Sequence, residues 1–239
     1  MKKLLALSLA WTAHLFTSLG LLAAAGIGVR IVQGGDRGFR DAFLLMWLAT
    51  VIDALDGTYA KWVRAGELLP DFDGRRLDDL IDFQTYTSLP LLLIWRAGVL
   101  PPGWAPILLA PLIASAFAFS RRDAKTDDGY FLGFPSYWNL VAFYCYFLAM
   151  PGWAAAAMIG FFTILTFVPA RYLYSTQAGR LNLLANVLAA PWAVMLIWIT
   201  LKAPNRALAL ASLYFPLFYL GASWWVTLRR ARSGRGRAV

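Results

Sequence analysis

Two short segments carry the residues of this sequence that are best suited to chemistry. One begins at Asp53 and the other ends at Asp82, and both contain carboxylates three or four residues apart. At about 100° per residue of helix, this spacing places small and acidic side chains on one stripe of each segment. The two stripes consist of Asp53, Asp56, Gly57 and Ala60, and of Gly74, Asp78 and Asp82. Brought together they would form an acidic cage for Mg²⁺ or Mn²⁺, because hard divalent cations prefer carboxylate oxygens and share them with substrate phosphates.

The acidic residues of the chain concentrate in this region. Of the thirteen Asp and Glu residues, eight lie between Asp53 and Asp82. Asp53 and Asp56 fall inside a hydrophobic segment, where an unpaired carboxylate is costly and a functional role is the default interpretation. A simpler alternative is helix-end charge at the membrane interface, paired with Arg75 or Arg76. We prefer this alternative for three neighbouring acids, Asp71, Asp73 and Asp79.

Hydrophobic segments that are long enough to cross a bilayer must position these carboxylates. Hydrophobic residues make up 60% of the chain, charged residues only 15%, and the mean hydropathy is +0.58, which does not describe a soluble domain. At about 20 residues per crossing, eight transmembrane helices are expected, at 8–32, 38–65, 77–98, 103–121, 135–150, 152–175, 181–202 and 205–228. The fold class is therefore an all-α membrane protein. We expect one integral-membrane domain over residues 1–239, with its acidic signature at 53–82 and a basic tail at 229–239.

The basic residues predict the orientation of these helices. With both termini in the cytoplasm, sixteen of the 22 Lys and Arg residues fall on the cytoplasmic side, as the positive-inside rule requires. The acidic segments then face the cytoplasm, where a soluble substrate can reach them. The tail from Arg229 to Arg237 anchors this topology and contacts anionic lipid headgroups. Nucleic acid is not an expected partner, because the basic residues are scattered over membrane loops.

The acidic segments resemble the signature of the CDP-alcohol phosphotransferases, D-x-x-D-G-x-x-A-R, a spacer, and G-x-x-x-D-x-x-x-D. Every position matches except one, because Lys61 stands where that family has arginine. The twelve residues between Lys61 and Gly74 form a longer spacer than most members have, and this length is typical of the bacterial phosphatidylcholine synthase branch. The segments from His14 to Thr17 and from Lys125 to Asn139 also resemble that branch. The resemblance covers about residues 10–190.

The resemblance implies a helical bundle in the bacterial inner membrane, a cytoplasm-facing active site and a homodimer. Its reaction is transfer of the phosphatidyl group from CDP-diacylglycerol to choline with release of CMP, assisted by Mn²⁺ or Mg²⁺, expected as two ions. The expected metal ligands are Asp53, Asp56, Asp78 and Asp82. Asp82 is also the expected general base for the attacking hydroxyl. The residues expected to contact the donor are Thr17, Gly57, Ala60, Lys61, Arg64 and Gly74. Lys61 would neutralise the pyrophosphate as a point charge and not as a bidentate fork.

A separate group of aromatic and acidic residues could bind the acceptor alcohol. Choline carries a quaternary ammonium, which aromatic faces and a nearby carboxylate hold best. The candidate acceptor residues are Tyr86, Asp127, Tyr130 and Trp138. Most aromatic side chains of a membrane protein simply pack or form interface belts, so packing is the competing interpretation for each of these rings. For His14, the only histidine, we favour a contact between helices.

Two other functions remain open at this point. The same fold and donor could serve another alcohol, such as serine, glycerol phosphate or inositol phosphate. A phosphorylated acceptor would require a basic cluster, which Arg121, Arg122, Lys125, Arg171 and Arg180 could supply. The second alternative is a divalent-cation transporter or binding scaffold. The sequence shows no repeated half of the kind that alternating access favours, which argues against a transporter.

Overall fold

The computed structural model describes residues 2–124, 126, 130–173, 180–202 and 205–235. Helices account for most of these residues, and they pack into two compact units, residues 1–97 and 98–239. The predicted fold class, an all-α membrane protein, is confirmed.

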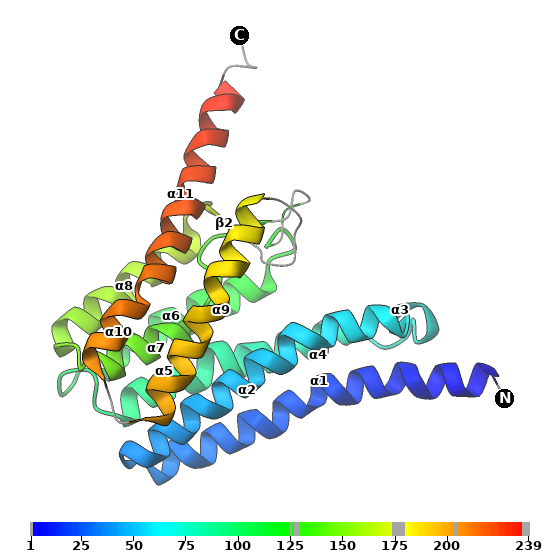
Figure 1. The fold of residues 1–239 in the computed structure, drawn as a ribbon, viewed down its shortest axis with the longest axis horizontal. Coiled ribbons are helices and arrows are strands. Elements are labelled where there is room, and N and C mark those ends of the chain that lie inside the picture. Colours follow the sequence, from blue (N-terminus) through cyan, green and yellow to red (C-terminus); the bar gives the residue numbers. More distant parts are fainter. Residues whose placement is uncertain (1, 125, 127–129, 174–179, 203–204, 236–239) are drawn as a thin grey trace. The chain divides into compact units, whose positions relative to one another are not determined.

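The first unit is built on a long helical hairpin. Helix α1 (Lys2–Gln33) and helix α2 (Gly35–Trp62) lie side by side (Figure 1). Gly34 and Gly35 join them with φ angles of 69° and 72°, a left-handed conformation that glycine adopts without strain. The two helices pack closely at Gly38 of α2, because glycine has no side chain there. A Cβ at this position would lie only 2.8 Å from the backbone oxygen of Arg30 in α1.

A third helical run completes this unit and packs against α1. After the short helix α3 (Ala65–Leu68), helix α4 (Gly74–Asp82) begins with Asp73 as its N-cap, whose side chain accepts a hydrogen bond from the backbone N–H of Arg76. The run continues through a π-helical turn, η1 (Phe83–Ser88), into α5 (Leu89–Arg96). The two acidic segments therefore lie on α2 and α4.

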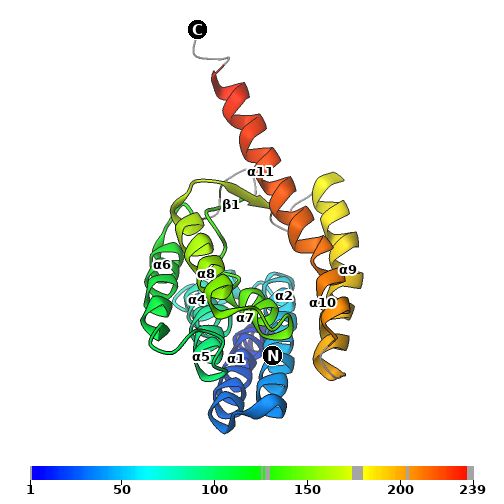
Figure 2. The same cartoon turned by 90° about the vertical axis from the view of Figure 1, so that its left-hand side faces the viewer.

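The second unit is also helical but contains one small β-ribbon. Its elements in chain order are η2 (Ala105–Leu108), α6 (Leu109–Ser120), β1 (Tyr130–Leu132), α7 (Trp138–Phe147), α8 (Gly152–Phe167), β2 (Arg171–Leu173), α9 (Arg180–Leu201), α10 (Arg206–Ser212) and α11 (Tyr214–Arg235). Strands β1 and β2 pair antiparallel with Phe131 opposite Tyr172. The run of α10 and α11 lies beside α9 in both views of the ribbon (Figure 1, Figure 2).

Three helical stretches of the described residues are long and apolar enough to cross a membrane: Lys3–Gln33, Arg180–Leu201 and Arg206–Arg230. Each of the eight expected segments contains helix, but in two of them the helix is shorter than expected. In the segment 135–150 the helix α7 has only ten residues, about 15 Å at 1.5 Å per residue, against a hydrocarbon thickness of about 30 Å. The segment 152–175 is helical only to Phe167, because the chain then turns into β2.

Candidate active site

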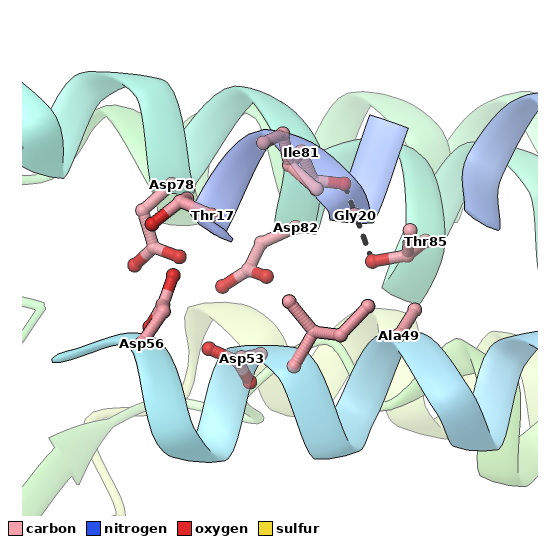
Figure 3. A pocket seen from close by; sticks show the side chains of 10 residues that line it. Thr17, Gly20, Ala49, Asp53, Asp56, Asp78, Ile81, Asp82 and Thr85 are labelled. Atoms are coloured by element: carbon pink, nitrogen blue, oxygen red, sulfur yellow. Dashed lines mark hydrogen bonds between the residues drawn. The ribbon is translucent and has the colours of Figure 1, made fainter. Parts of the chain in front are cut away.

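The two acidic stripes face each other in the first unit. Asp53 and Asp56 extend from α2, and Asp78 and Asp82 extend toward them from α4 (Figure 3). Helix α1 closes the site from a third direction. The residues that line the resulting pocket are Thr17, Gly20, Ala49, Ile52, Asp53, Asp56, Asp78, Ile81, Asp82 and Thr85. The four aspartates of the two predicted stripes thus line one pocket, and packing brings their helices together, whereas Gly57, Ala60 and Gly74 do not line it.

Three of the four carboxylates form a compact triplet. Asp53, Asp78 and Asp82 each offer one carboxylate oxygen, and these oxygens lie within 4.8 Å of one another. Asp56 lines the same pocket, is only 6% exposed and points toward Asp78 (Figure 3). The triplet thus joins side chains that are up to 29 positions apart in the chain.

The donor set fits a hard divalent cation. Two ionised carboxylates whose oxygens lie within 4.8 Å of each other repel by at least about 3.5 kcal/mol at an effective dielectric constant of about 20. Among the described residues, the carboxylates of Asp56 and Asp82 have no hydrogen bond and no ion pair. The cavity between the four side chains measures about 10 Å³, roughly the space for the centre of one water-sized sphere. A cation that accepts oxygen ligands would relieve the repulsion, and all the ligands that it needs from the protein are close together.

Small residues on α1 and α4 allow the third helix to approach. A Cβ on Gly20 would lie 2.7 Å from Cγ2 of Ile81, and a Cβ on Gly74 would lie 2.6 Å from Cε1 of His14. His14 is 8% exposed, and its ring lies 4.3 Å from that of Phe72 between ring centres. His14 therefore makes the expected contact between helices, but among the described residues its buried Nε2 has no hydrogen-bond partner.

The residues expected to contact the donor divide into two groups. Thr17 and Gly74 belong to the packed side of the site, and Thr17 lines the pocket directly. Gly57, Ala60 and Lys61 continue along α2 beyond the pocket, and a Cβ on Gly57 would meet nothing within 4 Å. The space beside Gly57 is open, whereas Ala60 packs against the cluster of Ala10, Ala13 and Ala65.

Arg64 follows the end of α2 in a left-handed conformation, with φ 56°. Its Nε donates a hydrogen bond of 2.9 Å to Oε2 of Glu67, and its NH2 group pairs with the same oxygen. The Arg64 guanidinium lowers the pKa of the Glu67 carboxyl below its ordinary value. Arg64 is exposed, so this is a surface pair at the end of the helix.

The described residues expected to contact the acceptor belong to both units, and each has a different environment. Tyr86 belongs to the first unit, and its hydroxyl donates a 2.7 Å hydrogen bond to Oδ2 of Asp53. Tyr130 lies on β1 of the second unit, where the guanidinium of Arg230 sits 5.1 Å above its ring. Trp138 opens α7, is fully buried, and its indole N–H donates to Oγ of Ser115 at 2.7 Å. Asp127 lies outside the described residues.

Five residues that line the pocket escaped sequence reasoning. They are Gly20, Ala49, Ile52, Ile81 and Thr85. Gly20 follows Thr17 by three residues on α1, and Ala49 precedes Asp53 by four residues on α2, so the same helical spacing that relates the aspartates could have indicated both. Ile81 and Thr85 each follow an aspartate of the site by three residues, and Ile52 precedes one by four, so the same spacing could have indicated them too.

None of the family models searched matches the chain, but several curated relatives do. It is similar to the phosphatidylcholine synthase of Legionella bozemanae, with 36% identity over 180 residues, or 72% of this chain and 83% of that protein. The phosphatidylcholine synthase of Legionella pneumophila is 32% identical over 91% of this chain and 88% of its own length. That of Pseudomonas aeruginosa is 30% identical over 92% of both chains.

The fold and the site together define a class of protein. An all-α membrane protein that gathers the carboxylates of D-x-x-D-G and G-x-x-x-D-x-x-x-D segments around one small cavity has the site expected of a CDP-alcohol phosphotransferase. Identities of 30–36% over most of the chain then decide the branch, and the chain belongs to the phosphatidylcholine synthase family.

Proposed function

We propose that this chain is a phosphatidylcholine synthase, a CDP-diacylglycerol–choline O-phosphatidyltransferase. It transfers the phosphatidyl group of CDP-diacylglycerol to choline and releases CMP. The observation that carries this proposal is the triplet of Asp53, Asp78 and Asp82, whose oxygens lie within 4.8 Å of one another, in a chain that belongs to this family.

Asp53, Asp56 and Asp78 are the proposed ligands of Mn²⁺ or Mg²⁺, and Asp82 is close enough to contribute. Carboxylate oxygens are the ligands that both cations prefer, and the resemblance to the family supports a pair of ions that shares these ligands with the substrate. When bound, such a cation stabilises the negative charge that develops on the pyrophosphate as CMP departs. The protein contributes by holding its ligands on two helices that do not need to rearrange.

Asp82 is the proposed general base. The choline hydroxyl oxygen attacks the phosphorus that carries diacylglycerol, and the bond from this phosphorus to the oxygen of CMP breaks. The hydroxyl proton passes to the Asp82 carboxylate, and the bond electrons leave with CMP as its phosphate. Because a carboxylate is a weak base for an alcohol, proximity and late proton transfer must contribute much of the effect.

The donor is proposed to lie along the cytoplasmic end of α2. Gly57 leaves open space for the nucleotide, and Ala60 keeps the next turn of the same stripe small. Lys61 and Arg64 are exposed cations that can neutralise the pyrophosphate. Thr17 and Gly74 are proposed to complete the donor site from α1 and the start of α4, since Thr17 lines the pocket and Gly74 lies one turn before Asp78.

For the acceptor, Tyr130, Trp138 and Asp127 are the proposed choline contacts. A quaternary ammonium has no hydrogen to donate, so aromatic faces and a carboxylate are its best partners. The Arg230 guanidinium above Tyr130 is consistent with a ring face that accepts cations. Choline should therefore be preferred to ethanolamine and serine, whose ammonium hydrogens need acceptors.

The proposed location is the bacterial inner membrane, with both termini and the active site cytoplasmic. The excess of Lys and Arg residues in the predicted cytoplasmic loops supports this orientation. We also propose a homodimer, on the resemblance to the family alone.

An acceptor panel tests the proposal. Purified protein is incubated with CDP-diacylglycerol, Mn²⁺ and one labelled alcohol at a time: choline, ethanolamine, serine, glycerol phosphate or inositol phosphate. The expected result is phosphatidylcholine and CMP in equal amounts, with choline used best. Efficient use of a phosphorylated alcohol without formation of phosphatidylcholine would overturn the choice of acceptor. If none of the alcohols led to release of CMP, the proposed reaction itself would be overturned.

A further inference from the structure

The hydrogen bond between Tyr86 and Asp53 connects the second acidic helix to a carboxylate of the first. The Tyr86 hydroxyl donates to Oδ2 of Asp53 at 2.7 Å across 33 positions of sequence. The same hydroxyl also interacts with the side chain of Thr50, one turn before Asp53 on α2. The tyrosine side chain is half-buried, so the bond is partly protected from water.

The backbone at Tyr86 has an unusual geometry. Residues Phe83–Ser88 form a π-helical turn, in which the N–H of Leu89 bonds to the carbonyl of Gln84 five residues earlier. Such turns are rare and occur frequently at functional sites. A physical cause stands four residues after Tyr86: Pro90 has no N–H for the Tyr86 carbonyl, and its ring would clash with that carbonyl in a regular α-helix. Tyr86 lies in this π-helical turn, and from there its side chain reaches Asp53 on α2.

We propose that Tyr86 is a positioning residue for the cation ligand Asp53, a role different from the acceptor contact expected of it from the sequence. The inference rests on the proposed function, because it assigns a cation to the carboxylates. One oxygen of Asp53 is held by the hydroxyl, which orients the carboxylate toward Asp78 and Asp82 before the cation binds. Partners that hydrogen-bond a metal ligand in this way commonly change metal affinity by roughly 10- to 100-fold when they are removed.

Removal of the hydroxyl oxygen of Tyr86 tests this role. Tyr86→Phe keeps the ring and removes only the hydroxyl. Binding of Mn²⁺ to the purified protein without donor or acceptor is measured from the loss of the electron paramagnetic resonance signal of free Mn²⁺. The Kd for Mn²⁺ is expected to rise roughly 10- to 100-fold, and the Mn²⁺ concentration for half-maximal turnover should rise with it. At saturating Mn²⁺ the KM for choline should stay unchanged.

Tyr59→Phe is the matched control. Tyr59 is also a tyrosine of the first unit whose hydroxyl is hydrogen-bonded, here to Oγ1 of Thr12 at 2.7 Å. Its hydroxyl contacts α1 and no aspartate, and Tyr59 does not line the pocket of the carboxylates, so its variant should bind Mn²⁺ like the wild type. A second test is Thr50→Val, which leaves Tyr86 intact and removes a second side chain that interacts with its hydroxyl. Its Kd for Mn²⁺ should rise less than that of Tyr86→Phe.

Three outcomes would overturn the inference. One is a Kd for Mn²⁺ that stays at the wild-type value in both Tyr86→Phe and Thr50→Val. Another is an equal loss of Mn²⁺ affinity in Tyr59→Phe. The third is a raised choline KM in Tyr86→Leu together with unchanged Mn²⁺ binding in Tyr86→Phe, which would place the ring at the acceptor. Failure of the proposed function is distinguishable, because a wild type that binds Mn²⁺ but makes no phosphatidylcholine would leave the Tyr86 measurement intact.

Discussion

The two glycines of the acidic signature should respond in opposite ways to the same substitution. Gly57 lies inside α2 and is exposed, and a Cβ there would meet no atom within 4 Å. Because glycine in a helix interior is about 0.5–1 kcal/mol less favourable than alanine, Gly57→Ala should stabilise the folded protein. For a chain of this size that corresponds to a rise of roughly 1–4 °C in Tm.

Gly74→Ala should destabilise the protein instead. Its Cβ would lie 2.6 Å from Cε1 and 3.0 Å from Nδ1 of His14, closer than van der Waals contact permits. The histidine ring is 8% exposed and is backed by Phe72, so it has little room to withdraw. Overpacking of this kind costs about 1–3 kcal/mol, which predicts a fall in Tm of roughly 2–12 °C.

Thermal unfolding in detergent and donor kinetics separate these effects. Gly57→Ala should be more stable but have a higher KM for CDP-diacylglycerol, because the added methyl group enters the space proposed for the nucleotide. In a His14→Ala background, Gly74→Ala should lose most of its destabilising effect, since the clashing ring is gone. The reasoning is refuted if Gly74→Ala unfolds at the wild-type temperature, or if the two single substitutions shift Tm in the same direction. An unchanged KM for CDP-diacylglycerol in Gly57→Ala would show that the nucleotide does not bind beside Gly57.

Three further predictions concern the chemistry. Asp53→Asn, Asp56→Asn and Asp78→Asn should each abolish turnover without lowering Tm, because each removes an anionic ligand and also like-charge repulsion; near-wild-type rates in all three would show that the ligands are assigned wrongly. Asp82→Asn should lower kcat far more than it raises the donor KM, whereas Lys61→Ala should raise the donor KM and Lys61→Arg should be tolerated. Equal losses of donor affinity in Asp82→Asn and Lys61→Ala would contradict the role of Asp82 as a base. Tyr130→Leu should raise the choline KM roughly 2- to 30-fold, as expected for the loss of about 0.5–2 kcal/mol of cation–π attraction, and leave the donor KM unchanged; a choline KM at the wild-type value would exclude this ring from the acceptor site.

Local regularity explains what could be read from the sequence. The backbone hydrogen bonds of a helix determine its period, so the spacing of Asp53 and Asp56 was sufficient to place them on one stripe. The same holds for Asp78 and Asp82 on α4. The scarcity of charge and the long apolar segments were sufficient for the membrane class. The β-ribbon was missed for the converse reason: three-residue strands such as Tyr130–Leu132 are too short to show a periodic signal, and they form only because Arg171–Leu173 lies beside them.

The sequence by itself thus determined the membrane fold class, the two acidic stripes and the family signature, all of which depend on composition or on residues within one turn of helix. Tertiary structure alone decided that the stripes face each other, that Gly20 and Thr17 of α1 close the pocket, and that Tyr86 reaches Asp53 from a π-helical turn. These features depend on which helix faces pack together. Such packing joins residues tens of positions apart, and no periodicity within a single helix records it.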